Sequence, residues 1–143
     1  MGLVRSKITL GNPKRTDLAS IEVEALVDTS AVHLCVPSHV AIQLDLEERE
    51  KREVTVADGS KHVVPYVGPV LASFGKRSCY TGAMVLGNEV LLGSIPMEDM
   101  DLVVRPLTRE LAPNPQSPNM PTSVAMGQRL SDRSQGAARR LKF

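Results

Sequence analysis

The apolar residues of this 143-residue chain fall in short stretches that turn-forming residues interrupt, and this spacing constrains the fold more than any other feature. In several stretches apolar and polar residues alternate with a period of two, which is typical of a strand that buries one face. Asp58-Gly59, between two such stretches, is a strong signal for a β-hairpin. We expect a hairpin at residues 53–67 and a turn at Lys76-Arg77, with strands at residues 3–10, 20–28, 69–75, 78–87, 89–94 and 101–107.

Two segments are suited to short helices. Pro37-Ser38 can begin one, and Pro96 lies early in a second at residues 95–100. Many short strands with one or two short helices indicate an all-β domain, either a small barrel or a sandwich. Hydrophobic residues make up 42% of the chain and aromatic residues only 3%, so the core must be aliphatic.

The composition changes after about residue 111. Prolines at positions 113, 115, 118 and 121 are followed by a segment rich in Ser, Gly, Gln and Arg, which has too few apolar residues to form a core. We therefore expect one folded domain at residues 1–111 and a disordered tail at residues 112–143, Pro-rich at first and then basic.

Several classes of function find no support in the sequence. A net charge of +1 gives no electrostatic reason to bind nucleic acid or an anionic membrane. No apolar stretch approaches the roughly 18 residues of a membrane span. The histidines lack metal-binding spacing, and Cys35 and Cys79 form neither a disulfide framework nor a metal site. We expect no metal or other cofactor, free buried thiols, and a reducing, cytoplasmic location.

Asp28 is the residue that most needs an explanation. It follows the apolar pair Leu26-Val27 and precedes Thr29 and Ser30. Burying a carboxylate costs several kcal/mol unless it is paired or well hydrogen-bonded. One explanation is a strand-end aspartate that accepts hydrogen bonds from its own turn, which position alone favours. The other is a carboxylate that hydroxyl and backbone N–H groups orient for catalysis.

Three stretches, in this order, resemble the retropepsin-like aspartic proteases, the single-domain relatives of pepsin. "ALVDTSA" (25–31) matches the loop that carries the catalytic aspartate, and "VTVADGSKHVV" (54–64) resembles the flap. "AMVLGNEVLLGS" (83–94) resembles the second apolar strand pair, which ends in Gly before a short helix. The similarity covers roughly residues 3–107, and "LLGSIPMEDMDLVVRP" (91–106) is closer to bacterial members than to viral ones.

The resemblance implies a closed β-barrel of the acid-protease fold, with one lobe per chain, and an aspartic endopeptidase activity. Members use two carboxylates that share one proton, one acting as base toward a water and the other as acid toward the scissile carbonyl. No other acid in residues 1–111 follows an apolar strand as Asp28 does. The second carboxylate must then come from another copy, which implies a C2 homodimer with both Asp28 residues at its axis.

The resemblance also implies roles for the neighbouring residues. Thr29 would hydrogen-bond across the dimer axis, Ser30 would help to align the substrate, and Asp28, Thr29 and Ser30 together form the catalytic set. The flap would close over an extended peptide or protein substrate. The residues expected to contact or support that substrate are Ala31, Ala57, Asp58, Gly59, Ser60, Leu92 and Gly93.

The chain departs from the family pattern at three positions. Ser30 stands where the family has Gly, which allows the substrate backbone to approach closely. Viral members carry an acid and an arginine where this chain has Val32 and Ser94. Two alternatives therefore stay open. One is a retropepsin-fold dimer that binds peptides but is catalytically weak or inactive because of Ser30. The other is a monomeric barrel of another family, with Asp28 as a turn residue.

Overall fold

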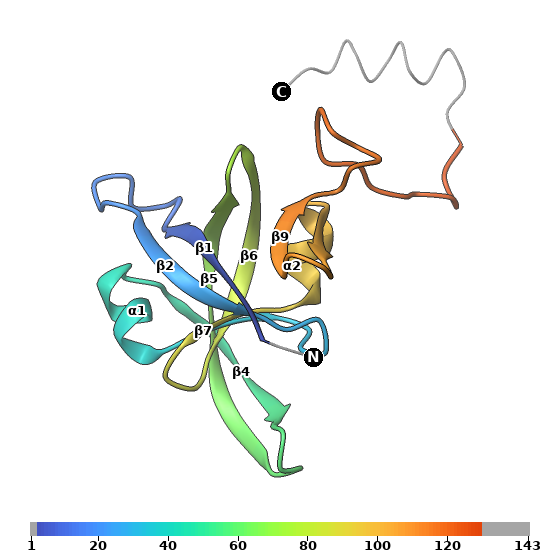
Figure 1. Cartoon of the computed structure of the whole chain (residues 1–143). Coiled ribbons are helices and arrows are strands. Elements are labelled where there is room, and N and C mark those ends of the chain that lie inside the picture. The colour runs from blue at the N-terminus through green and yellow to red at the C-terminus, as the bar shows by residue number, and fades with distance from the viewer. Residues whose placement is uncertain (1–2, 130–143) are drawn as a thin grey trace.

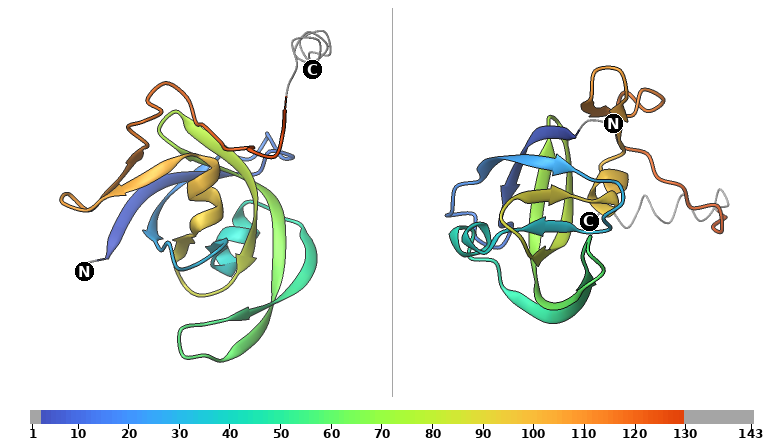
Figure 2. Two further views of the ribbon diagram at one scale, coloured as in Figure 1. Left: turned by 90° about the vertical axis from the view of Figure 1, so that its right-hand side faces the viewer. Right: turned by 60° about the horizontal axis from the view of Figure 1, so that its bottom comes forward.

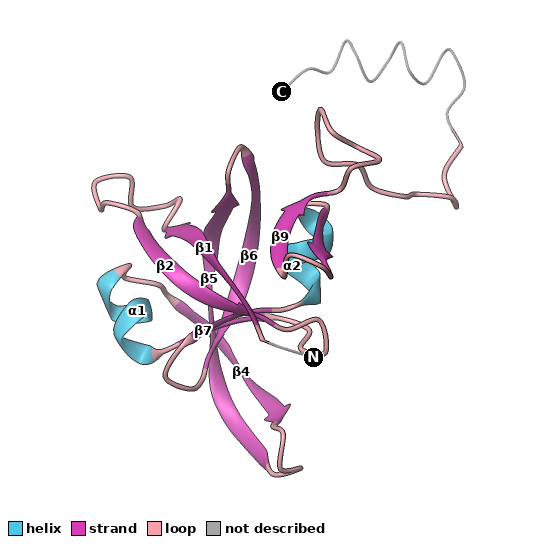
Figure 3. Cartoon of the chain, in the orientation of Figure 1, coloured by secondary structure: helices cyan, strands magenta, loops and turns pink. Residues whose placement is uncertain are grey.

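The computed structural model describes residues 3–129, which form a mainly β fold with two short helices (Figures 1 and 3). The helices are α1 (Ser38–Gln43) and α2 (Ser94–Asp99). The strands are β1 (Val4–Gly11), β2 (Ile21–Val27), β3 (Leu34–Val36), β4 (Glu48–Thr55), β5 (Lys61–Phe74), β6 (Arg77–Val85), β7 (Val90–Leu92), β8 (Leu102–Arg105) and β9 (Glu110–Pro113). Within residues 3–129, neither helix has the length and apolar character needed to cross a membrane.

Six of the strands close into a barrel. Their order is β1-β2-β7-β3-β6-β5, and β5 pairs back onto β1, with Leu10 opposite Ala72. β4 pairs with the other part of β5 and extends with it away from the barrel, as Figures 1 and 2 show. Closure leaves the barrel strands without a free edge. The predicted mainly β fold with a closed barrel is confirmed, and a sandwich is excluded.

One long strand replaces two that the sequence predicts separately. β5 runs without interruption through Gly68-Pro69, where the pairing with β6 shifts register between Val67 and Val70. A β-bulge of this kind bends a strand without ending it. Before the bulge β5 forms the predicted hairpin with β4, and after it β5 closes the barrel against β1. Gly-Pro is a bend inside one strand here.

Three strand segments are not evident from the sequence. β3 has three residues, too few for alternation to be recognised. The charged segment that begins at Glu48 becomes the start of β4, where both of its faces are exposed because it lies outside the barrel. β9 pairs with β8, so the predicted domain end at Leu111 falls inside a strand. Residues 130–143 of the predicted tail lie outside the described residues.

The core is aliphatic, as the composition predicts. The largest fully buried side chains come from the barrel strands and from the two helices and their C-terminal ends. Burying a large apolar side chain stabilises the fold by about 1.5–3 kcal/mol relative to an exposed position. They include Ile8, Leu10, Leu34, Val36, Leu44, Val70, Leu92, Pro96 and Met100.

Arg77 corrects the prediction of a turn at Lys76-Arg77. The turn lies at Gly75-Lys76, whereas Arg77 begins β6 and is only 5% exposed. Its Nη1 donates to the carbonyl oxygen of Asp101 at 2.9 Å, and its Nη2 donates to the carbonyl oxygen of Ser117. The guanidinium therefore joins the chain just after α2 to the segment beyond β9.

The Asp101 carboxylate holds that segment to the barrel. It accepts hydrogen bonds from Ser117 Oγ, from Asn114 Nδ2 at 3.1 Å and from the Thr122 N–H at 3.0 Å. The hydrogen bonds from Ser117, Asn114 and Thr122 lower the pKa of Asp101, and the charge of Arg77 adds to this effect. Contacts with the barrel therefore continue well past residue 111.

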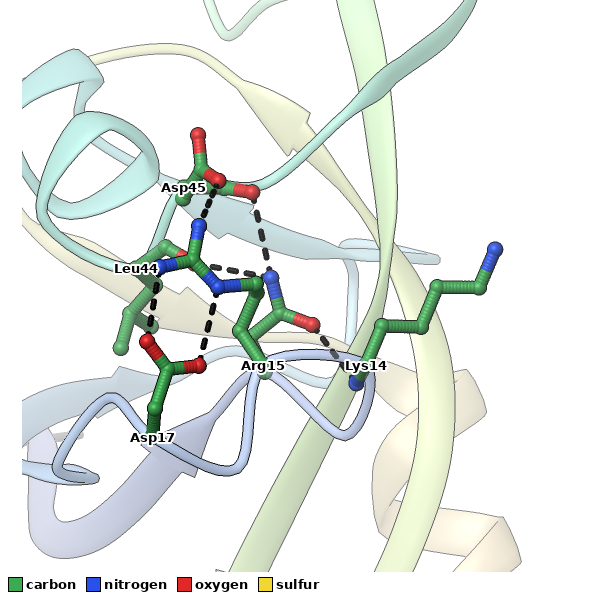
Figure 4. A network of polar contacts seen from close by, with 6 residues as sticks. Lys14, Arg15, Asp17, Leu44 and Asp45 are labelled. Atoms are coloured by element: carbon green, nitrogen blue, oxygen red, sulfur yellow. Dashed lines mark hydrogen bonds and ion pairs between the residues drawn. The ribbon is translucent and has the colours of Figure 1, made fainter.

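A second polar network involves Asn12, Arg15, Asp17 and Asp45 (Figure 4). Arg15 donates to Asp17 Oδ1 at 3.0 Å and to Asp45 Oδ2 at 2.5 Å, while Asn12 Nδ2 donates to the carbonyl oxygens of Leu44 and Asp45. These bonds join the β1–β2 turn to the end of α1. Because the ion pairs are exposed, they contribute little to stability.

We predict that Arg77→Leu lowers the free energy of unfolding by about 2 kcal/mol, because the variant loses buried hydrogen bonds made by a charged donor. Urea denaturation measures the change, with Lys76→Leu in the adjacent exposed turn as control. An unchanged urea midpoint for Arg77→Leu would contradict the contribution assigned to these bonds.

The stability that Asp101 supplies should depend on pH. Its pKa is lowered in the folded state, so its contribution is complete above the unfolded value of about 3.9 and is lost as the pH falls through the folded value. Asp101→Asn should therefore be less stable than the original protein at about pH 7, and the difference should shrink toward about pH 2. Urea midpoints across this range measure it. A difference that does not vary with pH would contradict a charged Asp101.

Candidate functional site

The loop of residues 28–33, which we call the Asp28 loop, crosses one end of β7. β2 runs parallel to β7 on one side and β3 runs antiparallel to it on the other. The chain must therefore leave β2 at Val27, pass over the end of β7 and enter β3 at Leu34. The Asp28 N–H donates to the Leu92 carbonyl at 3.0 Å, which extends the β2–β7 pairing into the loop.

Gly93 permits this crossing because nothing larger fits beneath the loop. A Cβ at position 93 would lie 2.3 Å from the His33 carbonyl oxygen and 2.9 Å from that of Ala31. Leu92 and Gly93 are both buried. From the sequence they are expected to contact or support the substrate, and the structure places them behind the Asp28 loop, away from its open face.

The start of α2 is hydrogen-bonded to the same loop. Ser94 N–H donates to the Ala31 carbonyl at 2.8 Å, and Ile95 N–H donates to the Val32 carbonyl at 2.9 Å. The first N–H groups of a helix lack partners within it, and α2 has no side-chain cap. Loop and helix thus satisfy each other's backbone groups.

Asp28 is half-buried as a residue, and its carboxylate is held at one oxygen. Oδ1 accepts hydrogen bonds from the Ser30 N–H at 3.0 Å and from Ser30 Oγ at 2.5 Å. Within residues 3–129, Oδ2 receives no hydrogen bond from a side chain or the backbone. Ser30 is not among the non-glycine residues of positive φ in this part of the chain, so a side chain is accommodated there without backbone strain.

The turn at Asp58 has the same local geometry. Asp58 Oδ1 accepts hydrogen bonds from the Ser60 N–H at 2.8 Å and from Ser60 Oγ at 2.6 Å. These bonds lower the pKa of Asp58. A short Asp-x-Ser turn therefore forms this pair of hydrogen bonds whether or not its aspartate is catalytic. Asp28 differs from Asp58 in its surroundings, because Asp58 is exposed at a hairpin tip whereas Asp28 borders a groove.

That groove, which we call the Asp28 groove, lies between the Asp28 loop and the β4–β5 hairpin and has a volume of about 670 Å³. Of the predicted site residues, Asp28, Ser30, Ala31 and Ala57 line it. Asp58, Gly59 and Ser60 form the predicted hairpin turn, where Gly59 has a φ of 84°, but they do not line the groove. Thr29 is exposed and lines a separate groove on the other side of the loop.

One wall of the groove contains polar residues that sequence reasoning missed. The Arg52 guanidinium carbon lies 3.9 Å from the centre of the Tyr66 ring, and the His33 ring meets Tyr66 edge-on with centres 5.8 Å apart. Burial lowers the pKa of His33, and the nearby charge of Arg52 lowers it further. The sequence gives no signal for this wall, because Arg52 and Glu53 are both charged and only the structure makes the first half-buried and the second exposed.

The remaining lining is mostly apolar and comes from distant parts of the chain. β3, the end of β6 and β7 bring together Cys35, Met84, Leu86 and Leu91. Only the tertiary structure joins these residues to β4. The groove therefore combines a largely apolar lining with the carboxylate of Asp28.

The cysteines are free thiols, of which Cys79 is buried and Cys35 half-buried. Burial raises the pKa of Cys79 to about 11. Burial also raises the pKa of Cys35, and the charge of Asp28 raises it further, so neither thiol is activated. Among residues 3–129, no group of three or more His, Cys, Asp or Glu side chains is placed to hold a metal ion.

Comparison with known proteins yields a structural likeness only. No protein-family model matches the chain. No curated protein matches its sequence. Among solved structures, the solution structure of Simian Foamy Virus (mac) protease matches with a TM-score of 0.42 and 14% sequence identity, covering 64% of this chain and 91% of that one. A likeness of this size assigns neither a family nor an activity.

We predict that Gly93→Ala displaces the Asp28 loop and lowers the free energy of unfolding by about 2 kcal/mol, because the added Cβ meets backbone atoms. Urea denaturation measures the loss, and hydrogen exchange at Ser94 and Ile95 reports on the loop–helix bonds. Gly127→Ala is the control, since a Cβ there meets no atom within 4 Å. Unchanged stability and exchange in Gly93→Ala would contradict the close packing.

Proposed function

We propose that the chain is one subunit of a dimeric aspartic endopeptidase of the retropepsin type, which hydrolyses peptide bonds in extended segments. The observation that carries the proposal is Asp28 itself. Asp28 lines a groove, and its carboxylate has Oδ1 held by Ser30 and Oδ2 without a protein donor within residues 3–129.

The mechanism uses the unbonded oxygen of each of two Asp28 carboxylates. One carboxylate takes a proton from a water, whose oxygen attacks the scissile carbonyl carbon, while the protonated partner gives its proton to the carbonyl oxygen. The C–N bond then breaks as the amine leaves with a proton from the pair. The bonds from Ser30 to Oδ1 orient each carboxylate and leave Oδ2 toward the water.

The second carboxylate is proposed to come from a second copy of the chain. Besides Asp28, the only acid lining the groove within residues 3–129 is Glu53, which is exposed on β4 with its carboxylate 4.0 Å from Lys61 Nζ. It is therefore a poor partner for a shared proton. A C2 dimer places the two Asp28 loops at the axis, with Thr29 on the side that faces the partner.

The substrate class follows from the shape and lining of the groove. β4 is the last strand of the sheet, and Arg52 to Ala57 of its hairpin line the groove. An extended peptide can add to such an edge through main-chain hydrogen bonds. Met84, Leu86 and Leu91 favour apolar side chains near the scissile bond. The free thiols support a reducing compartment, and we propose the cytoplasm.

A second candidate function is peptide binding without hydrolysis. It is favoured by the 2.5 Å contact between Ser30 Oγ and Asp28 Oδ1, where the family has a glycine with no side chain. In such a module the groove and hairpin keep their roles while the carboxylate serves only as a structural acceptor.

The catalytic role of Asp28 is testable by substitution. The dimer should cleave a denatured protein between about pH 4 and 6 in a pepstatin-sensitive reaction, and Asp28→Asn should reduce kcat by at least about 100-fold because no carboxylate remains to take the proton. Glu24→Gln, which changes an exposed acid on β2, the strand before Asp28, should leave the rate unchanged. Cleavage that survives Asp28→Asn would exclude the aspartic mechanism.

Ser30→Gly separates the two candidate functions. If the chain is a peptidase, the variant should keep kcat/KM within about tenfold, because the backbone N–H at position 30 still donates to Asp28. Cleavage by Ser30→Gly, with none by the original dimer, would show that the serine obstructs the site and would favour the binding module.

A further inference from the structure

The Asp28 groove carries a positive charge in a lining that is otherwise largely apolar. Arg52, on β4, is the only arginine or lysine that lines the groove within residues 3–129. His33, the last residue of the Asp28 loop, lines the same groove. Both side chains meet the ring of Tyr66 on β5, so the loop and the hairpin bring them to one place. An arginine placed in this way either covers the tyrosine only or also binds a group in the groove.

The guanidinium of Arg52 is held in position but keeps free donors. Its carbon lies 3.9 Å from the centre of the Tyr66 ring, a cation–π contact that holds the group over the ring. Its Nε donates to Glu50 Oε2 at 2.8 Å. The terminal nitrogens, Nη1 and Nη2, donate no hydrogen bond to another group within residues 3–129. Because a planar guanidinium binds a carboxylate through paired N–H groups, these nitrogens are suited to a second carboxylate.

The groups around Arg52 leave its charge available to a ligand. The Glu50 side chain is 56% exposed and that of Arg52 37%, so water screens their ion pair. Glu53, the next acid on the strand, lies 4.0 Å from Lys61 instead. Burial and the charge of Arg52 lower the pKa of His33. At about pH 7 its imidazole is therefore neutral and can donate one N–H group to an anion.

We propose that Arg52 and His33 form a subsite for an acidic side chain of the peptide that occupies the Asp28 groove. This inference rests on the proposed function, for which it names one substrate residue as Asp or Glu. The carboxylate of that residue accepts hydrogen bonds from the terminal nitrogens of Arg52 and from the His33 ring. Asp28 follows β2 and His33 precedes β3, on opposite sides of β7, so the acidic residue binds away from the scissile bond.

The amount of charge selects a carboxylate over a phosphate. Arg52 supplies one positive charge, which matches the single charge of an Asp or Glu side chain. A phosphorylated side chain carries a charge of about −1.5 to −2 and is typically bound by a cluster of arginines. With only one arginine in the lining and Glu50 bonded to it, a phosphate would remain incompletely neutralised.

Paired peptides test the subsite on the full chain. Dye-labelled apolar peptides, blocked at both ends, carry one Glu at successive positions, and a matched set carries Gln. Binding is measured by fluorescence anisotropy with the full-length Asp28→Asn variant, in which cleavage is not expected. At one position the Kd should be at least about tenfold lower for Glu than for Gln, because only the Glu peptide pairs its charge with Arg52.

Substitutions at position 52 identify the residue responsible. Arg52→Gln in the same background should abolish the preference for Glu, Arg52→Lys should keep part of it, and Arg52→Glu should reverse it in favour of a Lys peptide. Lys51→Gln is the matched control, because Lys51 is exposed on the same strand, carries the same charge and does not line the groove. It should keep the full preference, and circular dichroism should be the same for all these variants.

Three results would overturn the inference: equal affinities for Glu and Gln peptides at every position, no binding of either set, or a preference that survives Arg52→Gln. Cleavage by the original chain without any preference for acidic residues would also overturn it, while the peptidase function would stand. A preference for Glu that depends on Arg52, in a chain that cleaves no peptide, would support the subsite and contradict the proposed peptidase.

Discussion

The backbone contacts between the Asp28 loop and residues 92–95 hold the candidate site together. Three hydrogen bonds join the loop to the end of β7 and the start of α2, and Gly93 leaves just enough space for them. Through these bonds the loop takes its position from the barrel core on one side and from α2 on the other. Since α2 ends near Asp101, the buried Arg77 cluster also helps to fix the helix that supports the loop.

The comparison of Asp28 with Asp58 shows what local geometry can and cannot decide. Both carboxylates accept the same pair of hydrogen bonds from a serine two residues later. The two explanations that the sequence allows for Asp28, a turn residue or a catalytic residue, therefore predict the same local hydrogen bonds. Asp28 differs from Asp58 in lying between two grooves of similar size, one beneath the β4–β5 hairpin and the other beside the β8–β9 hairpin, and the catalytic proposal rests on this difference. An aspartate that only stabilises a turn has no need of a groove on either side.

Much of the strand pattern was predictable because it depends on local alternation. β1, β2, β6, β7, β8 and both helices lie where period and turn signals predict them. The strand predictions failed where contacts with distant parts of the chain override the local sequence pattern. Gly68-Pro69 became a bulge within β5, Arg77 became a buried strand residue, and Leu34–Val36 was too short to show a period. In each case a neighbouring strand supplies the hydrogen bonds or the burial that decides the conformation.

The sequence by itself determined the aliphatic core, the Asp58-Gly59 hairpin turn and the identity of Asp28 as the unusual carboxylate, because these depend on residue type and short spacing. The tertiary structure alone decided that β5 closes onto β1, that β7 lies between β2 and β3, and that Arg52, Met84 and Leu91 meet in one groove. It also placed Thr29 and residues of the β8–β9 hairpin around a second groove. These are pairings between residues far apart in the chain, and neither residue type nor local period specifies which distant strands will meet.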